Sequence, residues 1–437
     1  MVRRIGAFRQ VHAAHLHPNS VRDSLAAFVP PHCILQEPDV ARSPVRSHLS
    51  PAAQHRIDTS MHAASFEPPF AACVSRFTLA RLRAYMCGLP RYVEAMHVEQ
   101  LRGGRLEARH GVSTAAISFP ASGGEPVVLL DEDGSHQTFW RSAAKPFQLL
   151  AVLEALDASG HSENTPFTAR SLSDEELAIG AASHSGGDEH LTVVRRLLAR
   201  ADLDASQLMC GAERPLDSVE SQRLIRSGNA PSALHNDCSG KHTLMLWACL
   251  ANGWSTHDYL ALTHPMQQRV VQTVRRFTGT EHPTAIDGCG LPTFWMSMHH
   301  MALAWAHLAV AMDDPDTDPL LGRIGHAMSD HPELTSGAGR IDLAVAQRAQ
   351  GPFVGKIGAL GVFCVAWPAA RTGLAIKVHS GNDEALAVAV DAIVRSTCPG
   401  ALSPAAAWPW HAVSNVVGRV VGSRRLRASD TQVGMPS

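Results

Sequence analysis

A serine and a lysine stand one helical turn apart in the stretch "FWRSAAKPFQLL", residues 139 to 150. Of the 38 Lys and Arg residues, only Lys145, Lys241, Lys356 and Lys377 are lysines, and the other 34 are arginines. Arginine can replace a solvated surface lysine, but not a lysine whose amine must lose its proton. A neutral Lys145 could take the hydroxyl proton of Ser142 while that serine attacks a carbonyl carbon. We therefore predict nucleophilic chemistry at this pair.

A second serine and a second lysine follow in glycine-rich surroundings. Ser183 and His184 precede a glycine pair in "ASHSGGDEH", and Lys356 lies on a predicted strand in "FVGKIGALG". Glycines let backbone amides approach a ligand closely. The chain thus reads S-x-x-K, S-x-S and K-x-G in order, as serine β-lactamases read S-x-x-K, S-x-N and K-T-G. This order predicts two pairs in one site, Ser142 with Lys145 and Ser183 with Lys356.

Two cysteines form a third candidate group. Cys238 and Lys241 repeat the one-turn spacing in "HNDCSGKHTLML", and Cys289 stands between glycines in "DGCGLPTF". Cysteines framed by glycine are accessible, which suits metal binding or a reactive thiolate better than core packing. Two thiolates fall short of the usual four-ligand zinc set, so a third ligand would be a neutral lysine or a histidine.

These residues need a scaffold of helices and strands. Pro146 is tolerated if a helix begins near Ser142, because the amides of the first turn have no acceptor within the helix. Alternating polarity and glycine turns predict strands at both ends of the chain. Strands are expected within residues 97–110, 112–119, 126–134 and 353–381, and helices at 142–157, 189–201, 241–252, 264–278 and 294–312. The fold class is therefore α/β (α+β), with an antiparallel sheet flanked by helices and an inserted helical region.

Composition narrows the function classes. The net charge is -2 and 45% of residues are hydrophobic, which gives no electrostatic case for nucleic acid or an anionic membrane. No uninterrupted apolar stretch predicts a membrane span, and no secretory signal is recognisable. Nine cysteines at irregular spacing are typical of reduced thiols, which favours a cytoplasmic protein.

The chain divides into three predicted parts. Residues 1–95 hold eleven arginines, six acids and many prolines, and we expect a poorly structured or misannotated extension. A catalytic domain is expected over residues 96–400, and a C-terminal tail over residues 401–437.

The five motifs together resemble the bacterial L-asparaginase II family, which is unrelated to the threonine-dependent asparaginases. The resemblance runs from about residue 97 to about residue 390 on "RSAAKPFQLL", "ASHSGGDEH", "HNDCSGKHTLML", "DGCGLPTF" and "VGKIGALGVF". It implies a serine-β-lactamase/glutaminase-like fold, a cytoplasmic homodimer, and hydrolysis of L-asparagine to L-aspartate and ammonia. It also implies residue roles: catalysis by Ser142, Lys145, Ser183 and Lys356, substrate binding by Arg141, His184, Asn236 and Asp287, and zinc binding by Cys238, Lys241 and Cys289.

Two positions depart from the family pattern. Leu360 replaces the acid of K-x-G-A-E-G, and Ser380 replaces the acid of a late K-x-x-D-G. Both changes remove negative charge near the motifs. The alternatives to an L-asparaginase are a glutaminase, a β-lactamase-like serine hydrolase, or an inactive homologue that binds an amino acid or zinc. Ser142 is favoured as the nucleophile because it starts a helix beside the nearest amine, but Ser183 stays a contender.

Overall fold

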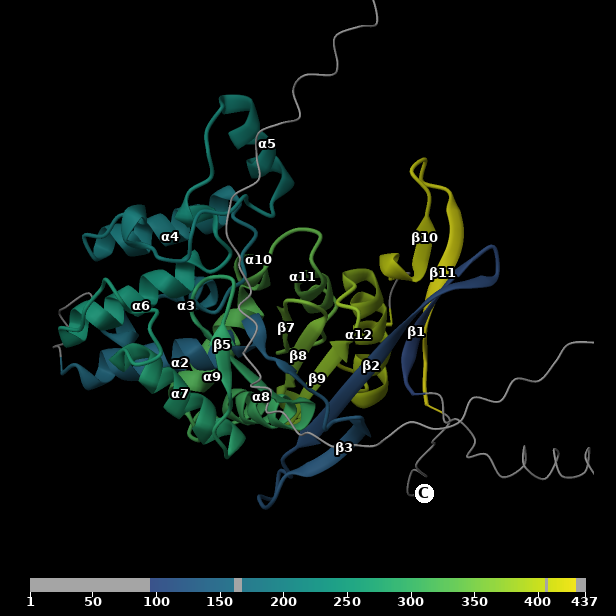
Figure 1. Cartoon of the computed structure of the whole chain (residues 1–437). Helices are drawn as coiled ribbons and strands as arrows, with labels where there is room; N and C mark the ends of the chain where they lie inside the picture. Colours follow the sequence, from purple (N-terminus) through teal and green to yellow (C-terminus); the bar gives the residue numbers. More distant parts are fainter. Residues whose placement is uncertain (1–94, 161–166, 405–407, 430–437) are drawn as a thin grey trace, which may run out of the picture. The chain divides into compact units, whose positions relative to one another are not determined.

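Both ends of the described chain contribute strands to one antiparallel sheet (Figure 1). The structure is a computed structural model that describes residues 95–160, 167–404 and 408–429, all within the unit Leu89–Ser437. The strand order is β10-β11-β1-β2-β9-β8-β7, and β3 pairs with β2 beside this path. The strands are β1 (His97–Arg102), β2 (Arg105–Ser118), β3 (Val127–Glu132), β7 (Val354–Gly358), β8 (Val362–Trp367), β9 (Thr372–Val378), β10 (Ala412–Ser414) and β11 (Val420–Arg427).

Both faces of the central strands are buried. Apolar side chains therefore stand on both sides of these strands, in place of an alternation of apolar and polar residues. Successive side chains of a strand point to opposite faces. On β8, Cys364 belongs to the apolar cluster that includes helix α8 (Met298–Asp313), whereas Phe363 belongs to the cluster that includes α12 (Asp383–Thr397). Gly373 on β9 permits close packing on α8, because a Cβ there would lie 2.1 Å from the nitrogen of Ala306. The sheet is therefore covered by helices on both faces.

A mostly helical region between β3 and β7 supplies most of the motif residues. Its core includes the fully buried rings of Phe147 and Trp247. Its helices are α2 (Lys145–Ala158), α3 (Asp174–Gly180), α4 (Asp188–Arg200), α5 (Ser218–Ser227), α6 (Ser239–Asn252), α7 (Pro265–Thr278), α9 (Pro319–Asp330), α10 (Pro332–Thr335) and α11 (Ile341–Ala346). A small sheet of order β4-β6-β5 joins Gln137–Phe139, Pro292–Ser297 and Thr284–Ile286. No described helix is both long and apolar enough to cross a membrane.

The predicted architecture is confirmed, with two corrections. The helix expected over residues 294–312 begins only at Met298, because Ser297 caps it and residues 292–297 pair with β4 and β5. The residues after 400 were predicted to form a tail, but β10 and β11 extend the main sheet and β11 pairs with β1. Of the predicted extension, residues 1–94 lie outside the described residues.

Candidate active site

Ser142 lies in a tight turn that leads into α2. A 3-10 turn, Arg141–Ala144, precedes the helix, and Pro146 occupies its first turn as expected. Arg141 adopts a φ of 55°, its backbone N–H donates to Thr293 Oγ1 at 3.2 Å, and its Nε donates to Asp287 Oδ1 at 2.6 Å. These contacts fix the turn and leave Ser142 half-buried at a cavity wall.

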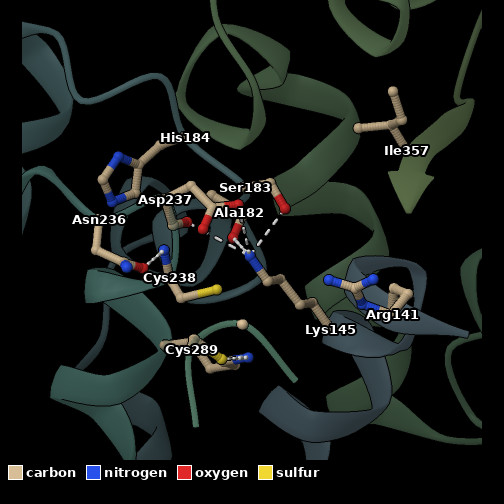
Figure 2. Close-up of polar contacts among 12 residues, drawn as sticks. Arg141, Lys145, Ala182, Ser183, His184, Asn236, Asp237, Cys238, Cys289 and Ile357 are labelled. Atoms are coloured by element: carbon tan, nitrogen blue, oxygen red, sulfur yellow. Dashed lines mark hydrogen bonds and ion pairs between the residues drawn. The ribbon is translucent and has the colours of Figure 1, made fainter. Parts of the chain in front are cut away.

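Lys145 is completely buried, and its amine contacts Ser183 (Figure 2). Nζ donates to the carbonyl oxygen of Ala182 at 2.6 Å and to Ser183 Oγ at 2.8 Å. It also lies 3.7 Å from Asp237 Oδ2. Among the described residues no hydrogen bond joins Lys145 to the hydroxyl of Ser142. The structure therefore connects the first lysine to the second serine, whereas the sequence pattern paired it with the first.

The loop that carries Ser183 is held from both sides. Backbone N–H groups of Ser183 and Ser185 donate to Thr335 and Ser336, and that of His184 donates to Asp237. The ring of His184 is fully buried: Nδ1 accepts from the Gly186 N–H at 3.1 Å, which leaves the proton on Nε2, 2.9 Å from Ser239 Oγ. Burial lowers the pKa of His184 well below its ordinary value. Both ring nitrogens are thus engaged within the protein, so this neutral histidine holds the serine loop in place.

Lys356 points from β7 into a buried ionic cluster. Its amine is fully buried, donates to the Ile357 carbonyl at 3.2 Å and lies 3.5 Å from Asp342 Oδ2. Burial lowers the pKa of Lys356 to about 7, although the Asp342 carboxylate opposes that shift. Burial would raise the pKa of Asp342, but the Lys356 and Arg340 cations outweigh it and hold that pKa below its ordinary value. No described hydrogen bond joins Lys356 to Ser183, so the predicted second pair stays a prediction.

Lys377 stabilises the turn that follows Lys356. Lys377 is 7% exposed and donates to the carbonyl oxygens of Leu360 and Val378. Leu360 is 68% exposed and has a φ of 61°, which is uncommon for a branched residue. Lys377 therefore has structural partners, and Leu360 presents an apolar side chain where the family resemblance predicts a carboxylate.

These segments surround two adjoining cavities. The first, of about 450 Å³, is lined by Ser142, Ser183, Leu216, Asp237, Gly339, Arg340, Ile341, Ile357, Gly358, Ala359, Leu360, Gly381, Asp383 and Trp410. The second has a similar size, about 510 Å³, and includes Arg141, Glu213, Asn236, Cys238, Asp287 and Cys289 in its lining. Ser142 and Asp237 line both. Most of the predicted site residues therefore surround one hollow region. The exceptions are His184 and the buried lysines Lys145, Lys241 and Lys356, which line neither cavity.

Two acidic residues in this region were not among the predicted site residues. Asp237 directly follows Asn236. The Lys145 cation and a hydrogen bond from Cys238 hold the pKa of Asp237 below its ordinary value, although burial would raise it. Asp342 is 2% exposed and accepts a short hydrogen bond from Ser336. The only sequence signal for Asp237 was its place inside the "HNDCSGKH" motif. Nothing in the sequence indicated that Asp342 faces Lys356, because that contact joins α11 to β7.

Asn236 connects two segments of the second cavity. Its Nδ2 donates to the carbonyl oxygen of Cys210 at 3.0 Å and lies 3.3 Å from Glu213 Oε2. Its Oδ1 accepts the Cys238 N–H at 2.9 Å. The side chain therefore links the residue 210–213 segment to the start of α6, where the cysteine and lysine of the third motif stand.

The side chains of Cys238, Lys241 and Cys289 form a compact cluster of possible metal ligands. Lys241 Nζ lies 3.7 Å from Cys289 Sγ and 3.2 Å from Gln148 Oε1. Hydrogen bonding from Cys238, with Lys241 nearby, lowers the pKa of Cys289, while the pKa of Cys238 is raised. Of the two thiols, that of Cys289 is therefore the more easily ionised. Two thiols and an amine converging at a buried site fit a zinc ion, provided that Lys241 gives up its proton on binding.

No curated protein matches the chain. A solved β-lactamase from Sphaerobacter thermophilus is 15% identical, with a TM-score of 0.32 and coverage of 66% of this chain and 92% of that chain. A putative β-lactamase from Bacteroides dorei is 10% identical, with a TM-score of 0.35 and coverage of 74% and 98%.

The family comparison covers most of the described chain. The model described as L-asparaginase II matches residues 98–426, a range that contains all five motifs and the strands from both chain ends. The chain therefore belongs to the L-asparaginase II family, which makes it a hydrolase of that family.

Proposed function

We propose that this hydrolase is an L-asparaginase, which converts L-asparagine and water to L-aspartate and ammonia. The observation that carries the proposal is the pair of serine hydroxyls on one cavity wall with two fully buried lysine amines behind it. A serine needs such an amine as a base, and the helix start at Ser142 favours developing negative charge. Membership of the family supplies the reaction class.

Ser142 is the proposed nucleophile. It is half-buried and lines both cavities, whereas Ser183 is only 1% exposed and already accepts a hydrogen bond from Lys145. Ser142 Oγ bonds to the side-chain amide carbon, and its proton passes to a neutral lysine amine. That proton then goes to the leaving nitrogen, so that the C–N bond breaks and ammonia departs. Water attacks the resulting ester and releases aspartate.

Lys356 is the proposed base. Because its pKa is about 7, a substantial fraction of its amine is neutral at neutral pH. Lys145 and Ser183, which are hydrogen bonded at 2.8 Å, form a polar connection along the same cavity wall. Hydrogen bonds at catalytic centres are often long before substrate binds and tighten in the substrate complex. In this proposal all four residues of the two predicted Ser/Lys pairs act together, but Ser142 takes its base from the second pair and Ser183 contacts the lysine of the first.

Charged groups in the cavities suit an amino-acid zwitterion. The Asp237 carboxylate, which lines both cavities, can accept the substrate ammonium group. Arg340 in the first cavity and Arg141 in the second offer guanidinium groups for the carboxylate. A cavity of about 450 Å³ accommodates asparagine and glutamine alike, so the proposal takes its preference for asparagine from the family.

Zinc is the proposed cofactor, held by Cys238, Lys241 and Cys289. When bound, the ion would act as a Lewis acid toward a polar substrate group beside the cavity. Cys238 and Cys289 line the second cavity, as does Arg141. A homodimer and a cytoplasmic location, which the family resemblance implies, belong to the same proposal, and sedimentation of the purified chain tests the dimer.

The test is ammonia release by the full chain from L-asparagine and from L-glutamine, with nitrocefin as a β-lactam substrate. Replacing Ser142, Lys145 or Lys356 by alanine should reduce kcat/KM for asparagine by at least ~10³-fold, as expected for loss of a nucleophile or base. Ser159→Ala is the matched control, because that serine ends the same helix and its hydroxyl donates to the Leu156 carbonyl, away from both cavities. Near wild-type rates in Ser142→Ala would refute the assignment, and turnover of glutamine or nitrocefin alone would refute the substrate.

A further inference from the structure

A second cluster of metal-binding groups lies outside the cavities. Asp133 and His136 stand in the turn between β3 and β4, and His379 directly follows β9. One ligand atom from each of the three lies within 4.8 Å of the others. None of the three lines either cavity described above. The cluster therefore belongs neither to the proposed catalytic groups nor to the cysteine site.

The backbone holds all three side chains in place. The turn is tied to the start of α8, because Met298 and His299 donate to the carbonyl oxygens of His136 and Gly134 at 3.1 and 3.0 Å. A Cβ at Gly134 would lie 2.4 Å from His299 Nε2, so glycine lets the His299 ring pack against the turn. On the opposite side, the His379 N–H donates to the Gly111 carbonyl at 2.9 Å. The ligands thus stand on fixed segments, which is what a preorganised site needs.

Side-chain contacts already bring the three groups together. The rings of His136 and His379 are stacked with centroids 4.5 Å apart and planes 13° apart. His136 Nδ1 lies 3.7 Å from Asp133 Oδ2. The hydroxyl of Ser113 on β2 donates to that same carboxylate oxygen at 2.8 Å and lies 2.8 Å from His379 Nε2. Small side-chain rotations would turn the three ligand atoms toward a common centre, and Ser113 would orient the carboxylate from the outer shell.

We propose that Asp133, His136 and His379 bind a divalent transition metal of the zinc class. Two imidazoles and one carboxylate match zinc, cobalt or nickel, whereas calcium and magnesium prefer all-oxygen sites. Asp133 is 56% exposed at its side chain and His136 is 30% exposed, so an ion and its water ligands have access. The bound ion would clamp the β3–β4 turn to the end of β9.

Cobalt titration of the untagged, chelator-treated full chain tests the proposal. Cobalt bound by cysteine gives a thiolate-to-metal charge-transfer band, whereas cobalt bound by histidine and carboxylate gives only weak d–d bands. In a Cys238→Ser background we expect d–d bands to develop with one equivalent of cobalt, and Zn²⁺ to displace them. His379→Ala should weaken this binding by at least ~10- to 100-fold, which is the loss that removal of an outer-shell partner of a metal ligand already causes.

The matched control is His110→Ala. His110 is a nearby histidine whose Nδ1 contacts Ser380 Oγ at 2.7 Å, outside the cluster. This variant should bind cobalt as its parent does, and circular dichroism should show that both variants are folded. Histidines elsewhere in the chain contribute equally to cobalt binding in every variant. The test is therefore the difference in cobalt binding between each variant and its parent. Equal cobalt binding in His379→Ala, His136→Ala and the parent would overturn the proposal, as would binding in the parent at millimolar cobalt only.

Discussion

Replacing Asp342 by asparagine should move the acid limb of the pH–activity profile to lower pH. Asp342 Oδ2 lies 3.5 Å from Lys356 Nζ, and both side chains are almost fully buried. Their attraction favours the protonated lysine and so raises its pKa, while burial lowers it. Asparagine keeps the size of the side chain but removes the charge. The remaining burial then lowers the pKa of Lys356 further.

The expected size of the pKa shift of Lys356 follows from the distance between its amine and the Asp342 carboxylate. With an effective dielectric constant of about 20, two unit charges 3.5 Å apart attract by roughly 5 kcal/mol. One pKa unit corresponds to about 1.4 kcal/mol, so the full attraction would equal about three and a half units. Ser336 and Arg340 also contact this carboxylate, and water relaxes around the vacated charge. We therefore expect a shift of at least ~1 unit.

The direction in which the acid limb moves follows from the role of the Lys356 amine as a base. If Lys356 is the base, activity requires its neutral form, and kcat/KM for asparagine falls as the pH drops through about 7. Because Asp342→Asn favours the neutral form, the variant should keep activity at pH values where the wild-type rate has already declined. The assay is kcat/KM for ammonia release between pH 5 and 9, with each rate corrected for the folded fraction.

The control is Asp391→Asn on α12, a buried aspartate whose Oδ1 accepts from Arg395 Nε at 2.9 Å. This variant should lose stability without moving the acid limb, because Asp391 lines neither cavity. An unchanged limb in Asp342→Asn, or a limb displaced to higher pH, would refute the assignment of the base to Lys356.

Two further predictions concern the zinc ligands and the turn beside the cavity. Cobalt added to the metal-free wild type should give a thiolate-to-cobalt band that Cys238→Ser weakens strongly, and absence of the band in the wild type would exclude metal binding by these thiolates. Gly361→Ala should cost clearly more free energy of unfolding than Gly418→Ala. Both glycines have a φ of 80°, but a Cβ at Gly361 would lie 2.6 Å from the Val378 carbonyl, whereas one at Gly418 meets nothing within 4 Å. Backbone strain alone costs ~1 kcal/mol, and equal losses in urea unfolding would contradict the close contact.

Local patterns predicted the strands and helices that position the motifs. The helix expected over residues 264–278 is α7, Pro265–Thr278, which begins after the His264 cap with a proline in its first turn. Short elements without a strong pattern were missed. Residues 292–297 form a strand only because β4 and β5 lie on either side of it. Residues 412–427 join the sheet because β1 offers an edge, which local propensity cannot reveal.

The sequence by itself determined the family and the set of candidate reactive side chains. Scarce lysines, glycine-framed cysteines and the order of the five motifs are one-dimensional features, and the family match over residues 98–426 confirms the resemblance they indicated. The sequence also placed Lys145 one turn after Ser142, because spacing along a helix is a local property.

Only the tertiary structure decided which groups touch. It placed the amine of Lys145 against Ser183, set Asp342 beside Lys356, and brought His379 to Asp133 across 246 positions (379 − 133) of the chain. Each contact joins segments whose approach depends on the packing of the sheet against its helices. The pKa of a buried amine depends on such neighbours and on its desolvation, which spacing along the chain does not specify.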